Sequence, residues 1–254
     1  MDDSKTSAKA VDLPQSGGIL LCFTQDPSKI PKVAQTVDAL FNWLGTPPKF
    51  SIALFLRDDP RQIAADEWPS RRTVNGGWTT PGDKMIFVYR AEEYERVLIH
   101  ETIHALNWDW EMSSKPLSCW GLGENAKLAP HLMEAWTELY AEWLWCGWFN
   151  VPWSSQRAHM DGQAVQVLSR AEQKRVDWEE NTNVFAYYVL KAALAPHLAF
   201  LWTFRNGVTP EERLHVLCGL ASPRLDALRA AAKTTTPKAI SMRMSCGTGT
   251  STAD

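Results

Sequence analysis

The sequence has few cysteines, no long apolar run and no strong excess of charge of one sign. Its five cysteines are widely spaced and form no CxxC pair, which is typical of mostly reduced thiols in an intracellular protein. No apolar run reaches the 18 residues of a membrane-spanning helix, and the polar start lacks a secretory signal pattern. The 26 basic and 29 acidic residues give a net charge of −3, which disfavours a polyanionic partner. We therefore expect an intracellular, cytoplasmic protein with no nucleic-acid or membrane partner.

Tryptophan, by contrast, is abundant. The chain of 254 residues has 13 tryptophans, and eight of them lie between Trp108 and Trp153. Most of these rings are expected in the core, because each can bury a large apolar area. Trp108, Trp110 and Trp120 are candidates to line a pocket for an aromatic or apolar side chain. Stacking on nucleic-acid bases is the alternative interpretation, which the lack of a basic groove in the sequence disfavours.

The N-terminal half of the chain alternates between strand and helix patterns. Short apolar runs predict buried strands, and apolar residues at helical spacing predict helices. The predicted elements are strands at 18–24, 50–56 and 85–89 and helices at 30–44 and 91–106. Alternation of this kind predicts an α/β half that spans residues 18–106.

The chain after residue 106 is predicted to be mainly helical. Residues 107–233 would form a helical half that joins the α/β half in one α+β domain covering 18–233. Residues 1–17 predict a flexible lead-in, and the polar, low-complexity stretch 234–254 predicts a disordered tail. The predicted helices cover 131–146, 154–178, 183–194, 197–204, 210–220 and 223–233.

The predicted helix 91–106 carries an HExxH motif. His100 and His104 are four residues apart, so both imidazoles lie on one face of the helix and can reach a single metal ion. Catalytic zinc sites have three protein ligands and an open position for water. Glu101 follows the first histidine, where its carboxylate can remove a proton from that water. The alternative interpretation, a structural pair of core histidines, has to explain two imidazoles and a carboxylate on an otherwise apolar helix.

A third ligand is predicted on the helix at 131–146. Glu134 and Glu138 are four residues apart and share a helix face, although most of their neighbours are apolar. One of the two carboxylates can bind the metal, and the other can accept the free ring N–H of a ligand histidine. The alternative is that both carboxylates belong, with Glu142, to a solvated helix face.

His100-Glu101-Thr-Ile-His104, followed by Glu134-Ala-Trp-Thr-Glu138, resembles the gluzincin branch of the zinc metallopeptidases. The resemblance implies that His100, His104 and Glu134 bind zinc, that Glu101 is the general base, and that Glu138 is an outer carboxylate that supports a ligand histidine. It also implies a zincin-like fold, in which a small mixed β-sheet lies over the HExxH helix and the C-terminal half is mainly helical. The resemblance covers about 40 residues.

Gluzincins usually supply one more histidine or tyrosine, which hydrogen-bonds the oxyanion of the tetrahedral intermediate. No motif in this sequence fixes that residue. The candidates are His131, Tyr140, His159, Tyr187 and Tyr188. We favour Tyr187 or Tyr188, because they lie in an apolar helix expected to pack under the zinc helices. The alternative is that both tyrosines are core aromatics.

The segment Asn75 to Trp78 is a candidate rim for a substrate groove. In zincin-like folds an edge strand above the metal binds the substrate main chain, and the glycine pair in this segment permits close backbone approach. The alternative is a simple Asn-Gly hairpin turn.

These features predict a zinc-dependent metallopeptidase that acts on a peptide or protein substrate, with Glu101 as general base. One alternative is a catalytically inactive zincin scaffold that serves as a structural or protein-interaction module. Another is a zinc hydrolase of a non-peptide amide or ester. A fourth protein ligand or a plugged cleft would favour the inactive scaffold. The motif does not separate peptide from non-peptide substrates, because the activation of water is the same chemistry.

Overall fold

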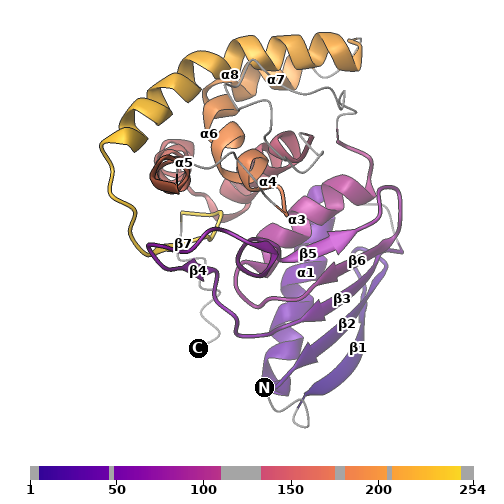
Figure 1. The fold of residues 1–254 in the computed structure, drawn as a ribbon. Coiled ribbons are helices and arrows are strands. Elements are labelled where there is room, and N and C mark those ends of the chain that lie inside the picture. The colour runs from indigo at the N-terminus through magenta and orange to yellow at the C-terminus, as the bar shows by residue number, and fades with distance from the viewer. Residues whose placement is uncertain (1–5, 46–48, 110–132, 175–180, 205–207, 247–254) are drawn as a thin grey trace.

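The computed structural model of the chain has a sheet layer and a helical layer (Figure 1). It describes residues 6–45, 49–109, 133–174, 181–204 and 208–246. The strands lie mostly in the N-terminal half, and the C-terminal half is mainly helical. The predicted α+β class is therefore confirmed.

The larger sheet has five strands in the order β1-β2-β3-β6-β5. Strands β2, β3 and β6 run parallel to one another, whereas β1 and β5 are antiparallel strands at the two edges. A separate small sheet pairs β4 with β7. Because β5 bonds only to β6 among the described strands, its outer edge offers backbone N–H and C=O groups to a further strand. The strands are β1 (Ser7–Leu13), β2 (Gly18–Thr24), β3 (Ser51–Phe55), β4 (Gln62–Ile63), β5 (Gly77–Thr79), β6 (Met85–Val88) and β7 (Ile240–Ser241).

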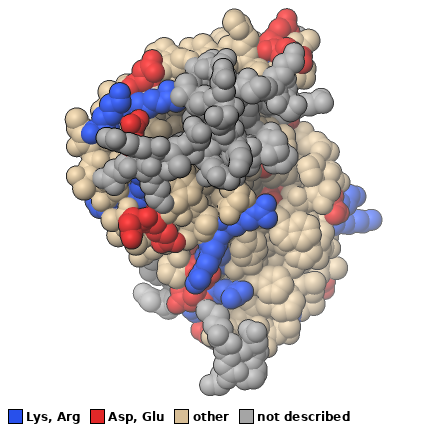
Figure 2. Space-filling model, viewed as in Figure 1, with Lys and Arg blue, Asp and Glu red and all other residues tan. Residues whose placement is uncertain are grey.

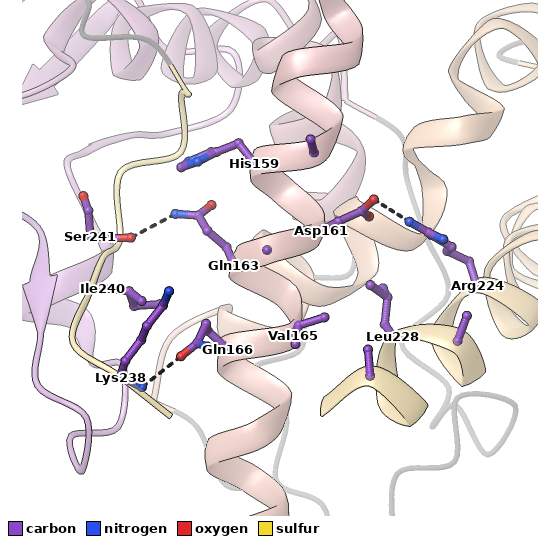
Figure 3. A pocket seen from close by; sticks show the side chains of 14 residues that line it. His159, Asp161, Gln163, Val165, Gln166, Arg224, Leu228, Lys238, Ile240 and Ser241 are labelled. Atoms are coloured by element: carbon purple, nitrogen blue, oxygen red, sulfur yellow. Dashed lines mark hydrogen bonds and ion pairs between the residues drawn. The ribbon is translucent and has the colours of Figure 1, made fainter. Parts of the chain in front are cut away.

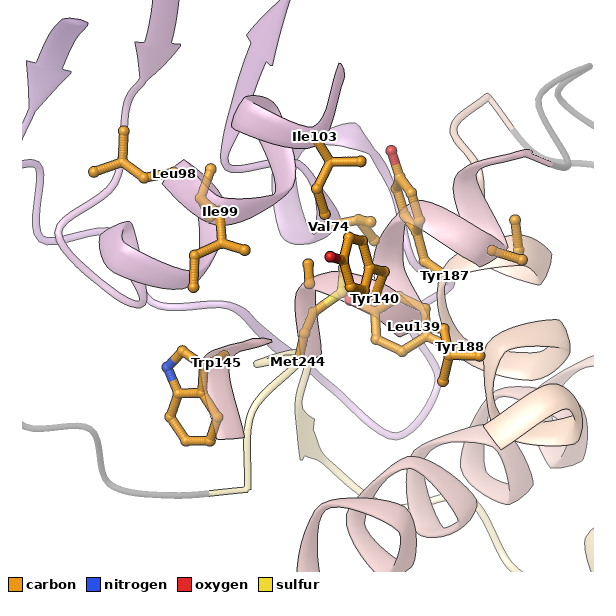
Figure 4. Close-up of a cluster of buried hydrophobic side chains, with 14 of the residues drawn as sticks. Val74, Leu98, Ile99, Ile103, Leu139, Tyr140, Trp145, Tyr187, Tyr188 and Met244 are labelled. Atoms are coloured by element: carbon orange, nitrogen blue, oxygen red, sulfur yellow. The ribbon is translucent and has the colours of Figure 1, made fainter. Parts of the chain in front are cut away.

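Two helices, α1 (Ile30–Leu44) and α3 (Tyr94–Ala105), pack against the sheet. Helix α1 buries Val33, Val37 and Leu40 at helical spacing, and it ends at Gly45 in the left-handed conformation with φ of 65°. All twelve residues of α3 are buried, because α3 also packs against the helix at Met133–Phe149 on its other side. Leu98, Ile99 and Ile103 of α3 lie in the buried cluster shown in Figure 4.

The two faces of the sheet are buried to different degrees. Side chains alternate along β2 between buried and exposed positions, because successive residues of a strand point to opposite faces. On the open face, Phe23 stacks on Phe55 and Trp78 stacks on Phe87, each with ring centroids 4.3 Å apart. Trp78 is 53% exposed. The strand predicted at 50–56 is largely buried, with Ile52, Ala53 and Leu54 at most 3% exposed, whereas the aromatic rings on this face stay partly exposed.

The helical half follows the predicted order with shifted boundaries. A π-helix, η4, replaces the first part of the helix predicted at 183–194, and the remaining helices begin and end within a few residues of their predicted positions. The helices not yet given are η2 (Pro27–Lys29), α2 (Arg71–Val74), α4 (Met133–Phe149), α5 (Trp153–Lys174), η4 (Phe185–Leu190), α6 (Lys191–Leu194), η5 (Ala195–His197), α7 (Leu198–Thr203) and α8 (Pro210–Lys233).

Helix α8 continues through Pro223, where the sequence predicted a break between two helices. That prediction is wrong. A proline removes one backbone hydrogen bond from a helix, which favours a break. However, Leu217, Ala221, Leu225 and Leu228 form one buried stripe on both sides of the proline. Burial of this continuous stripe stabilises the helix across the missing bond.

One run, Phe185–Thr203, is long and apolar enough to cross a membrane by length and composition alone. Its most apolar window is 61% buried inside the protein. Lys191, in the middle of the run, is fully buried and pairs with the Glu142 carboxylate at 2.8 Å. These contacts are typical of a core helix in a folded domain.

Both ends of the chain are more ordered than the sequence predicts. Residues 7–13 form β1, although 1–17 were predicted to be a flexible lead-in. Its seven residues pair with β2, and backbone bonding of this kind needs no apolar sequence. In the predicted disordered tail, Met242 and Met244 are almost fully buried. The polar composition of the tail as a whole conceals these two apolar residues, while 247–254 lie outside the described residues.

The described cysteines include both free thiols and a disulfide-bonded residue. Cys22, Cys146 and Cys246 are free thiols, as expected. Cys218 is disulfide-bonded, an exception among the mostly reduced thiols that the sequence predicts. The spacing of cysteines along a sequence does not reveal which of them meet in the fold.

Glu95, in the first turn of α3, gives the stability of the protein a pH dependence. It is 4% exposed, and burial raises the pKa of its carboxyl group from 4.5 to about 7. The folded state therefore binds this proton more tightly than the unfolded state does, and its stabilising contribution is lost as pH rises from 4.5 through 7.

We expect the Glu95→Gln variant to lack this pH dependence. Its free energy of unfolding, relative to that of the wild type, should rise by up to ~3 kcal/mol between pH 4.5 and pH 8. Urea unfolding at several pH values measures the difference, and exposed Glu172, changed to glutamine, is the control. Parallel stability curves for Glu95→Gln and the wild type would contradict the assignment.

Candidate metal centre

Helix α3 places the two histidines of the HExxH motif side by side. His100 Nε2 and His104 Nε2 are 2.9 Å apart, and the ring centroids are 4.6 Å apart. Each residue is 6% exposed. Because residues four apart lie on one face of a helix, the spacing in the sequence produces this contact directly.

Glu134, from α4, completes a group of three ligand atoms. Its Oε2 lies 3.4 Å from His100 Nε2 and 3.4 Å from His104 Nε2. A tetrahedral ion with bonds of about 2.0–2.1 Å holds its ligands about 3.3–3.4 Å apart. The carboxylate therefore stands at the spacing that a small divalent cation requires, and the imidazoles are slightly closer. Glu134 Oε2 is buried and has no hydrogen-bond partner among the described residues, which also fits a metal ligand.

Besides Glu134 at its Nε2 atom, each histidine has another carboxylate next to its Nδ1 atom. Glu138 Oε1 lies 2.9 Å from His100 Nδ1, a close ionic contact that lacks hydrogen-bond geometry. Asp109 Oδ2 lies 2.5 Å from His104 Nδ1, within hydrogen-bond distance. An acceptor at Nδ1 keeps the proton there and leaves Nε2 free to bind a metal. Glu138 thus lies where the sequence predicted an outer carboxylate.

Asp109 is a residue of the candidate site that the sequence analysis missed. It lies four residues after the end of α3, next to Trp108, which the sequence analysis treated as a candidate pocket residue. The available signal was a carboxylate close behind a ligand histidine in the sequence. Because the chain turns back after α3, that short separation becomes a direct contact.

The electrostatics of the group favour a cation. Burial lowers the pKa of His100 to about 4. The pKa of His104 is raised to about 10 against the effect of burial, by contacts with Asp109 and then Glu134. Despite burial, the two imidazoles lower the pKa of the Glu134 carboxyl group. Carboxylates at three points around two imidazoles form an environment in which a positive charge is stabilised.

Glu101 lies in a small chamber on the side of α3 that faces strand β5. The chamber, which we call the Glu101 chamber, has a volume of about 30 Å³, enough for about one water molecule. A Cβ atom at Gly77 would lie 3.1 Å from Glu101 Oε1, so the glycine allows the close approach of β5. Burial raises the pKa of Glu101 to about 8. The lining of the chamber includes Gly77, His100, Glu101, Tyr187 and Met244.

The structure distinguishes the two candidate tyrosines. Tyr187 lines the Glu101 chamber, its ring centroid is 6.1 Å from that of His100, and its hydroxyl accepts a 3.4 Å hydrogen bond from Asn183. Tyr188 instead donates its hydroxyl to the Met242 carbonyl at 2.9 Å. Adjacent residues of a helix point in different directions, so only one of the pair lies at the site. Tyr188 has a structural contact and we remove it from the candidates.

The other candidates lie elsewhere. Tyr140 is part of an aromatic cluster and stacks on Trp136 with ring centroids 5.5 Å apart. His159 Nε2 contacts the Arg243 carbonyl at 2.9 Å. His131 lies outside the described residues. Among the described candidates, Tyr187 is the one that lines the Glu101 chamber.

The tryptophans around the metal helices are divided between core and surface. Trp136 and Trp145 are almost fully buried, as the sequence predicted for most of them. Trp143 is 42% exposed and packs beside Trp202 with ring centroids 5.8 Å apart. Trp108 is half-buried, with its ring centroid 6.4 Å from that of Tyr140. Two other predicted pocket residues, at positions 110 and 120, lie outside the described residues.

Two buried cations contact the carboxylate of Glu138. Arg96 contacts the Glu138 carboxylate, and Lys191 Nζ lies 3.5 Å from Glu138 Oε2. Both cations also reach Glu142, at 3.4 Å and 2.8 Å respectively. Glu142 is therefore part of a buried ionic layer, and the alternative of a solvated helix face is wrong for it.

Comparisons of the chain with protein-family models, with curated proteins and with solved structures found no match. His100, His104 and Glu134 form a group that could hold a divalent metal ion, with Glu101 and Tyr187 on one side of it.

Proposed function

We propose that the protein is a zinc-dependent metallopeptidase. The observation that carries the proposal is the convergence of His100 Nε2, His104 Nε2 and Glu134 Oε2 within 4.8 Å of one another, with Glu101 next to the first ligand on α3. Two imidazoles and one carboxylate are a ligand set of catalytic zinc sites, which leave a fourth position for water. The likeness to the gluzincin motif supports the same assignment.

Zinc, when bound, polarises a carbonyl group and lowers the pKa of water in the open position. Glu101 then accepts the proton of the attacking water and transfers it to the leaving amine. Tyr187 donates its hydroxyl to the oxyanion that develops at the carbonyl oxygen. The Asp109 carboxylate keeps His104 in the tautomer that presents Nε2, and the Glu138 carboxylate lies beside His100 Nδ1, where it favours a proton on that nitrogen.

The edge strand β5 supplies a binding mode for a peptide. Its outer edge can pair with an extended substrate by backbone hydrogen bonds, and Gly77 brings this strand against Glu101. Trp78 at the open face offers an aromatic contact to an apolar side chain. Nucleic acid is disfavoured, because basic side chains lie among acidic ones on the face shown in Figure 2 and the chain has a net charge of −3.

Incubation of the zinc-loaded protein with a peptide library, followed by mass spectrometry, tests the proposal. We expect new peptide termini that disappear when a chelator removes the metal and return when zinc is added back. A panel of non-peptide amides and esters is run in parallel. Cleavage in that panel alone would assign the protein to the non-peptide hydrolases, and no zinc-dependent cleavage in either panel would contradict a hydrolase.

The Glu134→Ala variant tests the third ligand. We expect it to bind zinc at least about 100-fold more weakly than the wild type, because loss of even an outer partner costs 10–100-fold. Elemental analysis after dialysis and competition with a chromophoric chelator measure the change. Exposed Glu211, changed to alanine, is the matched control. Unchanged zinc affinity in Glu134→Ala would move the third ligand elsewhere.

A structural zinc centre is the second candidate, and the burial of the site favours it. The ligand residues are 6% to 9% exposed, and the Glu101 chamber holds about one water molecule. A structural site has a fourth protein ligand, whereas a catalytic site has exchangeable water in that position. Cobalt substitution separates the two, because azide or a hydroxamate changes the visible spectrum only when a coordination position is open.

A further inference from the structure

Residues 240–246, which we call the C-terminal strap, run through the interior close to the metal centre. The strap begins as β7, paired with β4. Met242 N donates to the Arg61 carbonyl at 2.5 Å, and the Met242 carbonyl accepts the Tyr188 hydroxyl. Met242 and Met244 are 0% and 2% exposed. The strap is therefore part of the folded core, not an appendage.

Polar contacts hold the strap along helix α5. Gln163 Nε2 donates to the Ser241 carbonyl at 3.1 Å, and just before the strap Lys238 N donates to Gln166 Oε1 at 3.1 Å (Figure 3). A cavity of about 620 Å³ opens between α5, α8 and this part of the chain. Because packing is incomplete on that side, these hydrogen bonds fix the path of the strap.

The strap lies against a buried ion cluster behind the metal ligands. Its most buried side chains are three cations and three carboxylates, whose charges balance, and Arg243 of the strap, 23% exposed, lies 3.8 Å from Glu93 at the edge of the cluster. The six buried side chains are at most 2% exposed, and one carboxylate, Glu138, contacts the ligand His100. The members of the cluster are Arg61, Glu93, Arg96, Glu138, Glu142 and Lys191.

The strap satisfies hydrogen-bonding groups of this cluster. Glu93 accepts bonds from Met244 N at 3.0 Å and Ser245 N at 2.8 Å, and it also contacts the Ser245 hydroxyl. Gln156 connects the cluster to the strap at a second point, because its Nε2 donates to Glu142 at 2.7 Å and to the Met244 carbonyl at 2.6 Å. Buried carboxylates need such donors, so the cluster and the strap depend on each other.

Two contacts connect the strap to the metal helix itself. Glu93 immediately precedes α3 and has the left-handed φ of 60°, so its carboxylate joins the start of the metal helix to the strap. The Met244 side chain lines the Glu101 chamber with His100 and Tyr187, and its sulfur lies 3.8 Å from Lys191 Nζ. The strap thus meets both the scaffold and the cavity of the site.

We propose that the C-terminal strap is a positioning element of the metal centre: Glu93 and Gln156 anchor it, and Met244 closes the Glu101 chamber. The inference rests on the proposed metal site for its consequence. Without the strap, the ion cluster is open to water, the start of α3 loses its anchor, and the ligands lose their fixed spacing.

Two truncated proteins test this role. One ends at residue 246 and keeps the strap, and the other ends at residue 239 and lacks it. Zinc affinity is measured by competition with a chromophoric chelator, and circular dichroism reports the fold. We expect the first protein to match the full chain and the second to bind zinc at least tenfold more weakly. Equal affinities for the full chain and both truncated proteins overturn the inference while the metal site stands.

Point variants give a second measurement of the role of the strap. If the shorter protein fails to fold, this measurement decides the question. Met244→Ala and Met242→Ala each remove one buried methionine side chain from the strap, but only Met244 lines the Glu101 chamber. We expect Met244→Ala to release zinc to the chelator at least tenfold faster than Met242→Ala does. Equal release rates overturn the role of Met244. A full chain that binds no zinc instead contradicts the proposed function, so the two failures are distinguishable.

Discussion

Glu101→Gln is expected to abolish hydrolysis while leaving the metal in place. A general base contributes about 10²- to 10⁴-fold to the rate, and a loss of this size is expected in kcat. Glutamine has nearly the same shape as glutamate but cannot accept the proton of water. The ligand atoms of His100, His104 and Glu134 are unchanged in this variant. Zinc occupancy by elemental analysis and cleavage of a responsive peptide are measured on the same sample.

The position of Glu101 explains why Glu101→Gln should lose peptide cleavage but keep its zinc occupancy. Its carboxylate lines the chamber beside His100, is 5% exposed, and does not belong to the group of ligand atoms. Glu101→Asp is the informative partner variant, because it keeps a carboxylate but withdraws it from the chamber. We expect its activity to fall between that of the wild type and that of Glu101→Gln. Full activity in Glu101→Gln would show that another group is the base.

Lys191→Met is expected to have the largest effect on stability. Lys191 is fully buried and lies 2.8 Å from Glu142 and 3.5 Å from Glu138. Methionine fills a similar volume but leaves the ion cluster with an uncompensated carboxylate. Removing one partner of a buried ion pair costs about 3–5 kcal/mol. Urea unfolding with and without a chelator measures the loss in the metal-free protein and the metal-bound protein.

A double variant tests whether charge balance is the cause. Lys191→Met combined with Glu142→Gln again has equal numbers of cations and carboxylates in the cluster. We expect it to be more stable than the single Lys191→Met variant by about 1–3 kcal/mol, because the two sites interact directly. A single variant that loses less than about 1 kcal/mol would contradict the view that Lys191 is needed to balance buried carboxylates.

The candidate metal ligands could be predicted because each pair follows from helix periodicity. His100 with His104, and Glu134 with Glu138, are four residues apart, and both helices form where apolar residues predict them. The prediction that one glutamate faces the metal and the other supports a histidine agrees with the positions of Glu134 and Glu138. Local geometry is therefore sufficient for this part of the site.

Other parts of the site depend on contacts between distant segments. Tyr188 faces the strap because of the rotation of the π-helix, a detail that apolar spacing does not determine. The strap itself is drawn into the core by Glu93 and Gln156, which are about 90 to 150 residues away in the sequence. The polar composition of the tail as a whole predicts disorder, and the apolar residues of the strap become ordered only through these long-range partners.

The coordination of zinc in the full chain, measured by X-ray absorption at the zinc edge, tests the central claim most directly. We expect one zinc ion per chain, with imidazole nitrogen and carboxylate oxygen ligands at about 2.0–2.2 Å and a further light atom from water. His100→Ala should lose one imidazole from that shell. A shell containing cysteine sulfur, or a protein that does not retain zinc, would contradict a catalytic centre built on His100, His104 and Glu134.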